Sequence, residues 1–497
     1  MSVLLGEQVR VIRRMPGVPS DSSSPLGWVA GIIVALTVAC AACPLPGQQA
    51  APEPPTPASP QQPGAGAQLH TGTASGLEAD TRLQNLLADH QFPALKAQLN
   101  QMPPEQAQFY RGILANRDND LKTSIELLEP LIDKVAAGGN AEQEKLLRKA
   151  LAEDYLRQGD WTKAAKAYQA LDTHLQGKLS RDEQDEIEEP LKLLPLAQTN
   201  PPMTVDPCDP FRLQVSRNPL GLTDIPVYVD ARPHSWMLDP TAPFNLISRS
   251  LAKEAGLKVS EEAATIHSIT GRPMQIHVAV IPRFTVGGRL TLRNMTVFVF
   301  EDADYFYPKT KYQVEGVLGY PALSAMGSLT ITSNATVEIR PVVQILPAEK
   351  DDLLTQGARF FLDGDQVIVA LSKGLGSSVE PKAGDERMFI VDAAGQQTYF
   401  TARYYDEHTA DFVDQKMELF AIPGSQSLPP QPAYIAETIP LTIGPTTVNI
   451  HYVQVLTQPV GSAALDDVYG VLGVDVLDQL KTYTFDYRTM RFGVSAE

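Results

Sequence analysis

Two ten-residue stretches, VEGVLGYPAL at 314–323 and VYGVLGVDVL at 468–477, carry the pattern that decides the fold. Both contain V-x-G-V-L-G-x-x-x-L, and the second begins 154 residues after the first. Their glycines would allow close backbone packing beside apolar residues. If the motif marks a duplicated unit, neighbouring features should repeat at a similar offset.

The flanking sequence repeats as predicted. WMLDPTAPFNLIS at 236–248 and FIVDAAGQQTYFT at 389–401 each place an aspartate, Asp239 or Asp392, after an apolar run and before small residues. These two aspartates are 153 residues apart. Each run therefore predicts a buried strand that ends at a carboxylate in a turn.

Two further features complete the alignment. FTVG at 284–287 corresponds to LTIG at 441–444, and SLTITSNATVEI at 328–339 corresponds to TYTFDYRTMRF at 482–492 as a terminal hairpin. Features in one order at nearly constant offset predict two copies of one β-rich unit. We place these units at 210–345 and 350–497.

The repeated unit predicts a chemistry. Two units related by a pseudo-two-fold axis would bring Asp239 and Asp392 together at their interface. Carboxylates a few ångströms apart cannot both ionise cheaply, so one keeps a proton. Such a pair can activate a water toward an amide carbonyl and protonate its oxygen. The glycines expected to brace the two loops are Gly316, Gly319, Gly470 and Gly473.

On these residues the chain resembles the aspartic peptidases, specifically bacterial retropepsin-like and pepsin-like proteins with two lobes in one polypeptide. The resemblance covers about 210–497. It implies an all-β bilobal body of two related β-barrel lobes, with an interlobe cleft that binds extended polypeptide. It also implies catalytic roles for Asp239 and Asp392 and a flap hairpin, for which HSITGRPMQ at 267–275 is the candidate.

The motifs depart from the family pattern, in which each aspartate is followed by Thr-Gly. Pro240 and Thr241 follow Asp239, whereas Ala393 and Ala394 follow Asp392. Proline removes a backbone N–H, and alanine has no hydroxyl to lock the loops together. Two hypotheses therefore stay open: an aspartic endopeptidase of reduced or altered activity, and a pseudopeptidase that binds peptides without cutting them.

A helical domain is predicted at 76–200. Its clearest unit, KALAEDYLRQGDWTKAAKAYQAL at 149–171, has the small and aromatic spacing of a tetratricopeptide-like (TPR-like) helical hairpin, with Gly159 at the turn. The alternative is a generic helical domain. Either would be an interaction module, which makes a third hypothesis: an envelope scaffold whose helices recruit a protein partner.

The N-terminal 43 residues resemble a secretory signal. Three arginines precede the uncharged stretch at 27–42, which is short for a spanning helix. Cys40 and Cys43 lie where a bacterial lipoprotein signal places its lipidated cysteine; ordinary cleavage and a retained anchor are the alternatives. A Pro-rich linker at 44–75 would tether the folded body to the membrane. We expect an exported protein, periplasmic or in the cell envelope.

Composition excludes several classes. The 497 residues include 41 Lys and Arg against 58 Asp and Glu, a net charge of −17, which argues against a nucleic-acid binder. Three cysteines, Cys40, Cys43 and Cys208, are too few for a disulfide scaffold or a Cys-rich zinc module. We expect no cofactor and no metal, and a polypeptide as substrate or ligand.

Overall fold

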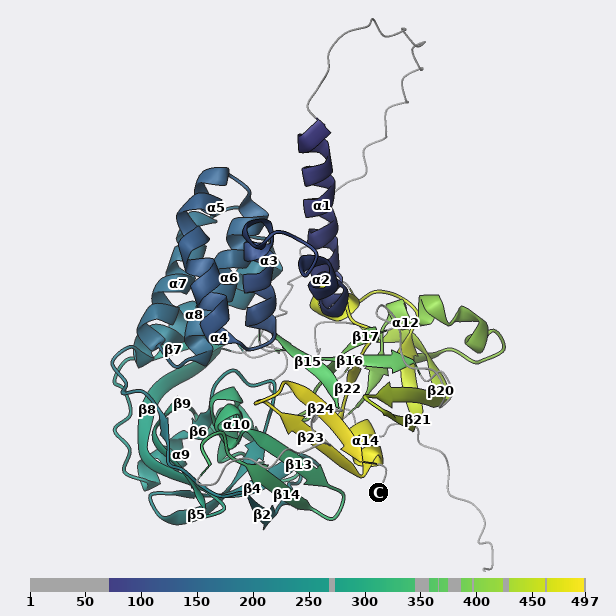
Figure 1. Cartoon of the computed structure of the whole chain (residues 1–497). Helices are drawn as coiled ribbons and strands as arrows, with labels where there is room; N and C mark the ends of the chain where they lie inside the picture. The colour runs from purple at the N-terminus through teal and green to yellow at the C-terminus, as the bar shows by residue number, and fades with distance from the viewer. Residues whose placement is uncertain are drawn as a thin grey trace, which may run out of the picture.

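The computed structural model describes residues 71–267, 273–344, 357–364, 366–373, 386–395, 397–422, 429–460 and 463–495. Cys40, Cys43, the predicted signal and nearly all of the Pro-rich linker lie outside these residues, as does the tip of the candidate flap hairpin. Figure 1 shows helices stacked on one side of a β-rich body.

The first part of the described chain is helical and is called the helical module below. Its α-helices are α1 (Thr71–Ala88), α2 (Phe92–Leu99), α3 (Pro104–Arg117), α4 (Leu121–Leu128), α5 (Ile132–Gly138), α6 (Ala141–Arg157), α7 (Trp161–His174) and α8 (Arg181–Ala197). Helix α1 begins inside the range predicted for the linker, five residues before the predicted domain boundary. The module therefore starts slightly earlier than its composition suggested.

Local signals explain the α6–α7 hairpin. Gly159 has a φ of 74° and reverses the chain after α6, which a residue with a Cβ would do less readily. Asp160 then caps α7 by accepting a hydrogen bond from the backbone N–H of Lys163 at 3.0 Å. Tyr155 and Trp161 are buried, as the spacing predicted. The likeness of this hairpin to TPR units stays a prediction.

The first β-rich unit is called the first repeat. Its elements are β1 (Thr204–Val205), β2 (Phe211–Gln214), β3 (Ser216–Arg217), β4 (Thr223–Val229), β5 (Arg232–Leu238), β6 (Leu246–Ser248), α9 (Arg249–Glu254), β7 (Ala264–His267), β8 (Pro273–Val286), β9 (Leu290–Phe300), β10 (Phe306–Tyr307), β11 (Tyr312–Gln313), β12 (Gly316–Leu318), α10 (Tyr320–Met326), β13 (Ser328–Thr332) and β14 (Thr336–Arg340).

The second β-rich unit is called the second repeat. Its elements are β15 (Ala358–Asp363), β16 (Gln366–Lys373), β17 (Glu386–Val391), β18 (Tyr399–Phe400), α12 (Ala402–Glu407), β19 (Glu418–Phe420), β20 (Gln431–Ile443), β21 (Thr446–Leu456), α13 (Ala463–Asp466), β22 (Gly470–Leu472), α14 (Val474–Leu477), β23 (Thr482–Asp486) and β24 (Arg491–Ser495).

The two repeats share one unusual strand arrangement. In the first, β12 lies between β5, which runs parallel to it, and β6, which runs antiparallel. In the second, β22 lies between β17 and β18 in the same directions. Both arrangements continue to the parallel pairs β6–β9 and β18–β21, and both include a long hairpin, β8–β9 or β20–β21. The aligned sequence features therefore lie at matching places.

The terminal hairpins join the repeats. Strand β13 pairs antiparallel with β23, so the hairpins β13–β14 and β23–β24 belong to one sheet with β15 and β2. Within the described residues this sheet has 13 strands, and a separate 9-stranded sheet is formed entirely by strands of the first repeat. Pairing the hairpins covers strand edges that would otherwise be open. The prediction of two barrels stays a prediction, and the sheet shared by the repeats was not anticipated.

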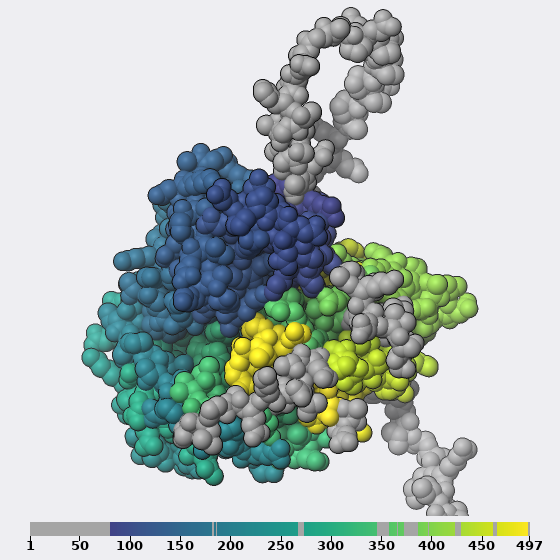
Figure 2. All heavy atoms as spheres, in the orientation of Figure 1, coloured from purple at the N-terminus to yellow at the C-terminus, as the bar shows by residue number. Residues whose placement is uncertain are grey.

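The short strands before the aspartates are buried on both faces. Leu238 and Val391 lie in an apolar core between the sheets, whereas Met237 and Ile390 lie in a second apolar cluster that includes the helices. Such strands appear as continuous apolar runs, as both do here. The helical module therefore covers the face that carries the two aspartate loops, and Figure 2 shows it seated directly on the β-rich body.

Candidate functional site

Asp239 lies at the end of β5 and is fully buried. Its backbone N–H donates to the carbonyl of Leu318 at 3.1 Å, which continues the β5–β12 pairing into the loop. Its Oδ1 accepts from the backbone N–H of Thr241 at 2.9 Å and from the Thr241 hydroxyl at 2.7 Å. Its Oδ2 is buried without a hydrogen-bond partner in the part of the chain that the structure describes.

Asp392 occupies the matching place at the end of β17. Its backbone N–H donates to the carbonyl of Leu472 at 2.9 Å, and its side chain is buried. Its Oδ1 accepts from the backbone N–H groups of Ala394 at 3.0 Å and Gly395 at 2.7 Å. A Cβ on residue 395 would lie 2.1 Å from Asp392 Oδ2, so the loop requires glycine there.

The fold brings the two carboxylates into electrostatic range of each other. Burial raises the pKa of Asp239 to about 6. Burial, and after it the negative charge of Asp239, raises the pKa of Asp392 to about 7. Because the charge of Asp239 acts on Asp392, ionising the first carboxyl group makes ionising the second more costly. Near neutral pH such a pair holds a proton, as general acid–base chemistry requires.

The glycines named from the sequence pack against the aspartate loops. A Cβ on Gly319 would lie 2.2 Å from the carbonyl oxygen of Phe244, and one on Gly473 would lie 2.7 Å from the backbone of Gln397. Gly316 and Gly470 are just as close to Trp236 and Phe400. Gly319 and Gly473 therefore allow the chain after β12 and β22 to lie directly against the loops, and Gly316 and Gly470 allow these strands to lie close to β5 and β18.

Two polar side chains hold the loops to these glycines, and the sequence analysis missed both. Asn245 Oδ1 accepts from the backbone N–H of Gly319 at 3.1 Å, and Thr398 Oγ1 accepts from that of Gly473 at 2.8 Å. Asn245 and Thr398 are 153 residues apart, the same offset as the aspartates. That offset was the signal that could have identified them.

The departures from Thr-Gly have different structural outcomes in the two loops. Thr241, one position later than a family threonine, still reaches the carboxylate of Asp239. Ala393 and Ala394 are buried and offer no hydroxyl, so within the described residues Asp392 is held by the backbone N–H groups of residues 394 and 395. Gly395 supplies the close approach one residue after the expected glycine. The sequence analysis found no glycine at the second position after Asp392, where the family pattern places it, and did not consider Gly395.

Three tyrosines, two of them buried and Tyr305 partly buried, lie within electrostatic range of the pair. Tyr305 and Tyr487 have pKa values raised by burial first and, as a smaller cause, by the charge of Asp239. Tyr399 has a pKa raised by burial and then by Asp392. The site is therefore a low-dielectric pocket, in which a charge developing on a substrate would feel nearby dipoles strongly.

The candidate flap is a hairpin in its described part. Strand β7 pairs antiparallel with β8, from Ala264 opposite Ile276 to His267 opposite Pro273, and the tip between them lies outside the described residues. Helix α8 packs against both strands. A cavity of about 30 Å³ between α8, the hairpin and the Asp239 loop is lined by residues that include Leu193, Phe244 and Ile266.

A second cavity, of about 80 Å³, lies between the helical module and the Asp239 loop. The loop contributes the run from Pro240 to Phe244, α6 contributes Arg157, and α8 contributes Ile187 and Glu189. Both cavities touch the residues that follow Asp239 directly. Space for a ligand side chain therefore exists beside the Asp239 loop, between it and the helices.

Other predicted features lie away from the pair. Cys208 is a buried free thiol in the segment before β2. Among the described residues, no group of three or more His, Cys, Asp or Glu side chains could hold a metal ion. Within that same part of the chain, no helix is both long enough and apolar enough to cross a membrane.

Comparison with known proteins bears on this site. Residues 225–322, from β4 through Asp239 to α10, match the family model described as aspartyl protease. The match supports an aspartic-protease-like family. A solved structure of a retropepsin-like aspartic protease from Rickettsia conorii is similar at 17% identity and a TM-score of 0.20, over 26% of this chain and 98% of that one. No curated protein matches.

Proposed function

We propose that the β-rich body is a two-lobed site of aspartic-peptidase type that binds extended polypeptide and hydrolyses it with Asp239 and Asp392. The observation that carries this proposal is the placement of both carboxylates at equivalent strand ends, where the charge of one raises the pKa of the other. Unrelated turn aspartates would not share both a strand arrangement and a common electrostatic environment.

The proposed chemistry follows from the paired carboxylates. The ionised aspartate takes a proton from a water, which attacks the carbonyl carbon of the scissile amide. The protonated aspartate donates its proton to the carbonyl oxygen. The aspartate that took the proton from water then gives it to the amide nitrogen, the other aspartate takes back a hydroxyl proton, and the C–N bond breaks to release an amine and a carboxylic acid. Buried surroundings strengthen both hydrogen bonds because little water competes for them.

The altered motifs bear on rate more than on binding. Thr241 and the backbone N–H groups of residues 394 and 395 hold the carboxylate oxygens in place of the family threonines. These contacts support a pair that keeps its orientation within each loop. They do not link one loop to the other, so the separation of the carboxylates depends on the surrounding sheet packing. Small displacements there would lower the rate steeply.

A second candidate function is a pseudopeptidase or envelope scaffold. The observation that favours it is the helical module, which covers the face that carries the aspartate loops. In this alternative the TPR-like helices recruit a protein partner. The signal with Cys40 or Cys43 would export the chain and anchor it as a lipoprotein, and residues 44–75 would tether it to the membrane.

The test is cleavage by the full chain. An unfolded protein is incubated with wild type between pH 4 and 8, with and without pepstatin, and the products are identified by mass spectrometry. We expect Asp239→Asn and Asp392→Asn each to abolish cleavage. Asp224→Asn is the matched control, since Asp224 is also a buried carboxylate whose pKa burial raises to about 6.

The three outcomes separate the hypotheses. Cleavage lost only in the Asp239 and Asp392 variants supports the peptidase. Binding of peptide without cleavage in wild type supports the pseudopeptidase. Neither binding nor cleavage, at any pH in the range, leaves the scaffold.

A further inference from the structure

Apolar contacts join the helical module to the first aspartate loop. Trp161, at the start of α7, packs against Phe244 with ring centroids 6.5 Å apart and against Phe298 at 6.4 Å. Phe244 lies five residues after Asp239 in the same loop. Helix α8 also lies against the β7–β8 hairpin, so the module touches both the loop and the candidate flap.

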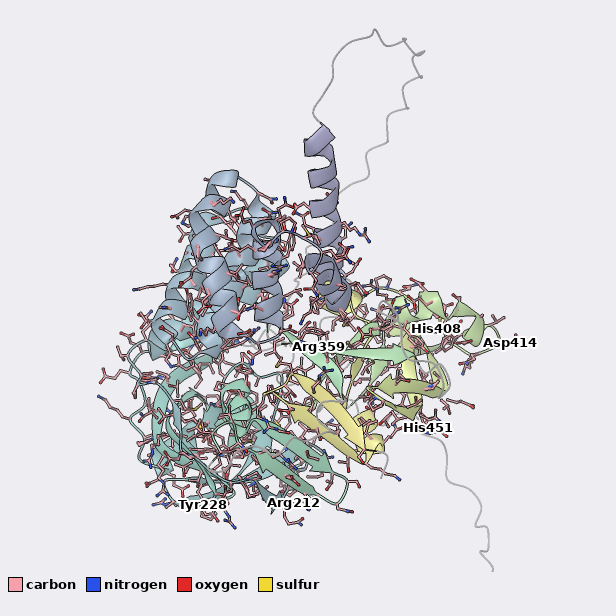
Figure 3. All side chains as sticks on the ribbon, in the orientation of Figure 1. Arg212, Tyr228, Arg359, His408, Asp414 and His451 are labelled. Carbon is pink, nitrogen blue, oxygen red and sulfur yellow. The ribbon has the colours of Figure 1, made fainter. Side chains whose placement is uncertain are left out.

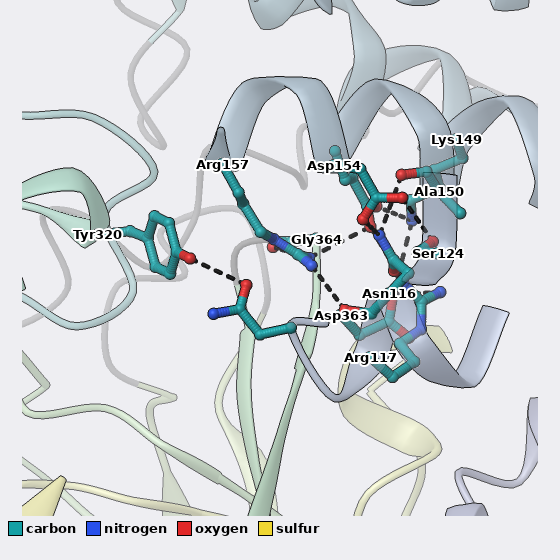
Figure 4. Close-up of polar contacts among 12 residues, drawn as sticks. Asn116, Arg117, Ser124, Lys149, Ala150, Asp154, Arg157, Tyr320, Asp363 and Gly364 are labelled. Atoms are coloured by element: carbon teal, nitrogen blue, oxygen red, sulfur yellow. Dashed lines mark hydrogen bonds and ion pairs between the residues drawn. The ribbon is translucent and has the colours of Figure 1, made fainter. Parts of the chain in front are cut away.

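A second contact holds the module to the second repeat. Phe92 of α2 packs on Phe361 of β15 at 4.7 Å between ring centroids. Beside it, Asp363 at the end of β15 forms an ion pair with Arg117, with its Oδ1 2.8 Å from Arg117 Nη2. Its Oδ2 lies 3.3 Å from His90 Nε2. Figure 4 shows this polar seam with Arg117 and Asp363 facing each other across the junction.

The charged groups of this polar seam act strongly on Asp363. Burial alone would raise the pKa of Asp363, but the cations of Arg117 and Lys149, together with the hydrogen bond from His90, hold it well below its usual range. Tyr320 of α10 adds a hydrogen bond from its hydroxyl to Asn119 Oδ1 at 2.9 Å. Arg359 of β15, labelled at the junction in Figure 3, pairs with Asp118. The module therefore contacts both repeats through paired, largely buried groups.

The space left beside the aspartates is small. The cavities of about 80 and 30 Å³ correspond to roughly six and two water molecules, at about 10–15 Å³ each. A peptide in extended form advances about 3.3 Å per residue and would need a continuous groove past both loops. Asp239 is 0% exposed and Asp392 is 5% exposed. Among the residues that the structure describes, neither cavity is large enough for an extended peptide while the module is seated against the Asp239 loop.

We propose that the helical module is an autoinhibitory cover: peptide reaches Asp239 and Asp392 only when α8 and its neighbours separate from the β7–β8 hairpin and the Asp239 loop. This inference rests on the proposed function, because it concerns regulation of the same site. Two sets of contacts keep the module in place: the aromatic contact at Trp161 and the ion pairs at Asp363. The apparent affinity for peptide is then the intrinsic affinity multiplied by the open fraction.

The test compares full-length variants that weaken these contacts from opposite sides. Asp363→Asn removes the charge that pairs with Arg117. Trp161→Ala removes the aromatic contact and changes no residue of the β-rich body itself. The matched control is Glu144→Gln, which breaks the 2.8 Å ion pair with Arg148 inside the module and crosses no junction. Pepstatin affinity by calorimetry and amide hydrogen exchange of residues 181–197 and 273–286 are measured for each.

We expect both junction variants to bind pepstatin about tenfold tighter than wild type or more, with faster exchange in both segments, since breaking a buried pair shifts such an equilibrium by at least that factor. Glu144→Gln should match wild type in both measurements. Because the two junction variants act on different contacts, one that fails to fold does not remove the test.

Other outcomes overturn the inference in distinguishable ways. If wild type binds pepstatin as tightly as the variants, the peptide site stands and the cover is wrong. If exchange rises in the variants but no protein binds pepstatin, the proposed peptide-binding function fails, and the cover fails with it. Unchanged exchange in both variants shows that these contacts do not hold the module closed.

Discussion

Asp239 and Asp392 are carboxylates placed where ionisation is costly, since burying a charge without a partner destabilises the folded state. Their hydrogen bonds come from the Thr241 hydroxyl and backbone N–H groups, not from a cation. Proteins usually keep such a group near a function, because a hydrophobic residue would be more stable in the same place. The proposed chemistry therefore depends on two residues that oppose the stability of the folded state.

The first prediction concerns pH and stability. In the folded state the pKa of Asp392 is raised to about 7 from the ordinary 3.8, so its contribution to stability is present below pH 3.8 and is lost as the pH rises toward 7. Asp392→Asn should therefore raise the free energy of unfolding at pH 8, relative to wild type, by on the order of 4 kcal/mol. Urea unfolding at pH 4, 6 and 8 measures the difference.

At pH 4 the same substitution should change the free energy of unfolding far less, because Asp392 is protonated in the folded state there. Asp239→Asn should behave alike over a window that ends near pH 6. Variant and wild-type curves that stay parallel from pH 4 to pH 8 would contradict the burial of these groups.

The second prediction concerns Gly395. A methyl group there would lie 2.1 Å from Asp392 Oδ2, so Gly395→Ala must displace the carboxylate or the loop. We expect a loss of about 1–3 kcal/mol in the free energy of unfolding, measured by denaturant titration. Gly493→Ala is the matched control, since nothing lies within 4 Å of an added Cβ there. Equal losses in both variants would argue against the close contact.

At the scale of elements, each aspartate loop is held against the strand that carries its glycines. Asn245 does this in the first repeat and Thr398 in the second, each by accepting from a glycine N–H. Thr398 also donates from its hydroxyl to Asp475 Oδ1 at 2.7 Å. An amide in one repeat and a hydroxyl in the other therefore perform the same task.

The third prediction tests this link. Thr398→Val keeps the shape of the side chain but leaves the buried N–H of Gly473 without its acceptor, which should cost about 1–3 kcal/mol in the free energy of unfolding. Thr398→Ser should recover most of that loss. The exposed Thr409→Val serves as the control. If Ser is no better than Val, the hydroxyl is not the group that matters.

Sequence patterns were most reliable for elements with a local cause. The α6–α7 hairpin follows from Gly159 and a regular apolar period, and the strands before the aspartates follow from their apolar runs. The glycine after Asp392 was misjudged because the sequence shows only spacing. Whether Gly395 approaches the carboxylate depends on the loop conformation, which no local pattern states.

At the scale of the whole molecule, two apolar clusters join parts that are distant in sequence. One cluster contains residues of both repeats, including Leu329 and Phe485 on the paired strands β13 and β23. The other contains the helices together with both aspartate-bearing strands. The two repeats and the helical module therefore share their apolar cores with one another.

The fourth prediction follows from these shared cores. Denaturant unfolding should be one transition, with the same midpoint for Trp161 at the helix junction and Trp236 within the first sheet. Two variants are made in the Trp28→Phe background: one keeps only Trp161 and the other keeps only Trp236. The fluorescence of each variant reports unfolding at its remaining tryptophan. Midpoints that differ would mean that the helical module unfolds separately from the β-rich body.

The amino-acid sequence was sufficient to identify two β-rich segments with matching features and the position of each aspartate after a buried strand. These features follow from apolar spacing and from glycines within a few residues of each other, where physical causes are local. The helical region could be recognised for the same reason.

Tertiary structure alone decided that β13 pairs with β23, that Asn245 and Thr398 hold the loops, and that the helices cover the aspartates. Each of these depends on contacts between segments far apart in the chain, such as Arg117 with Asp363. An apolar helix face shows that it needs a partner but not which surface provides one. The covering of the site is therefore a property of the folded chain, and local sequence does not encode it.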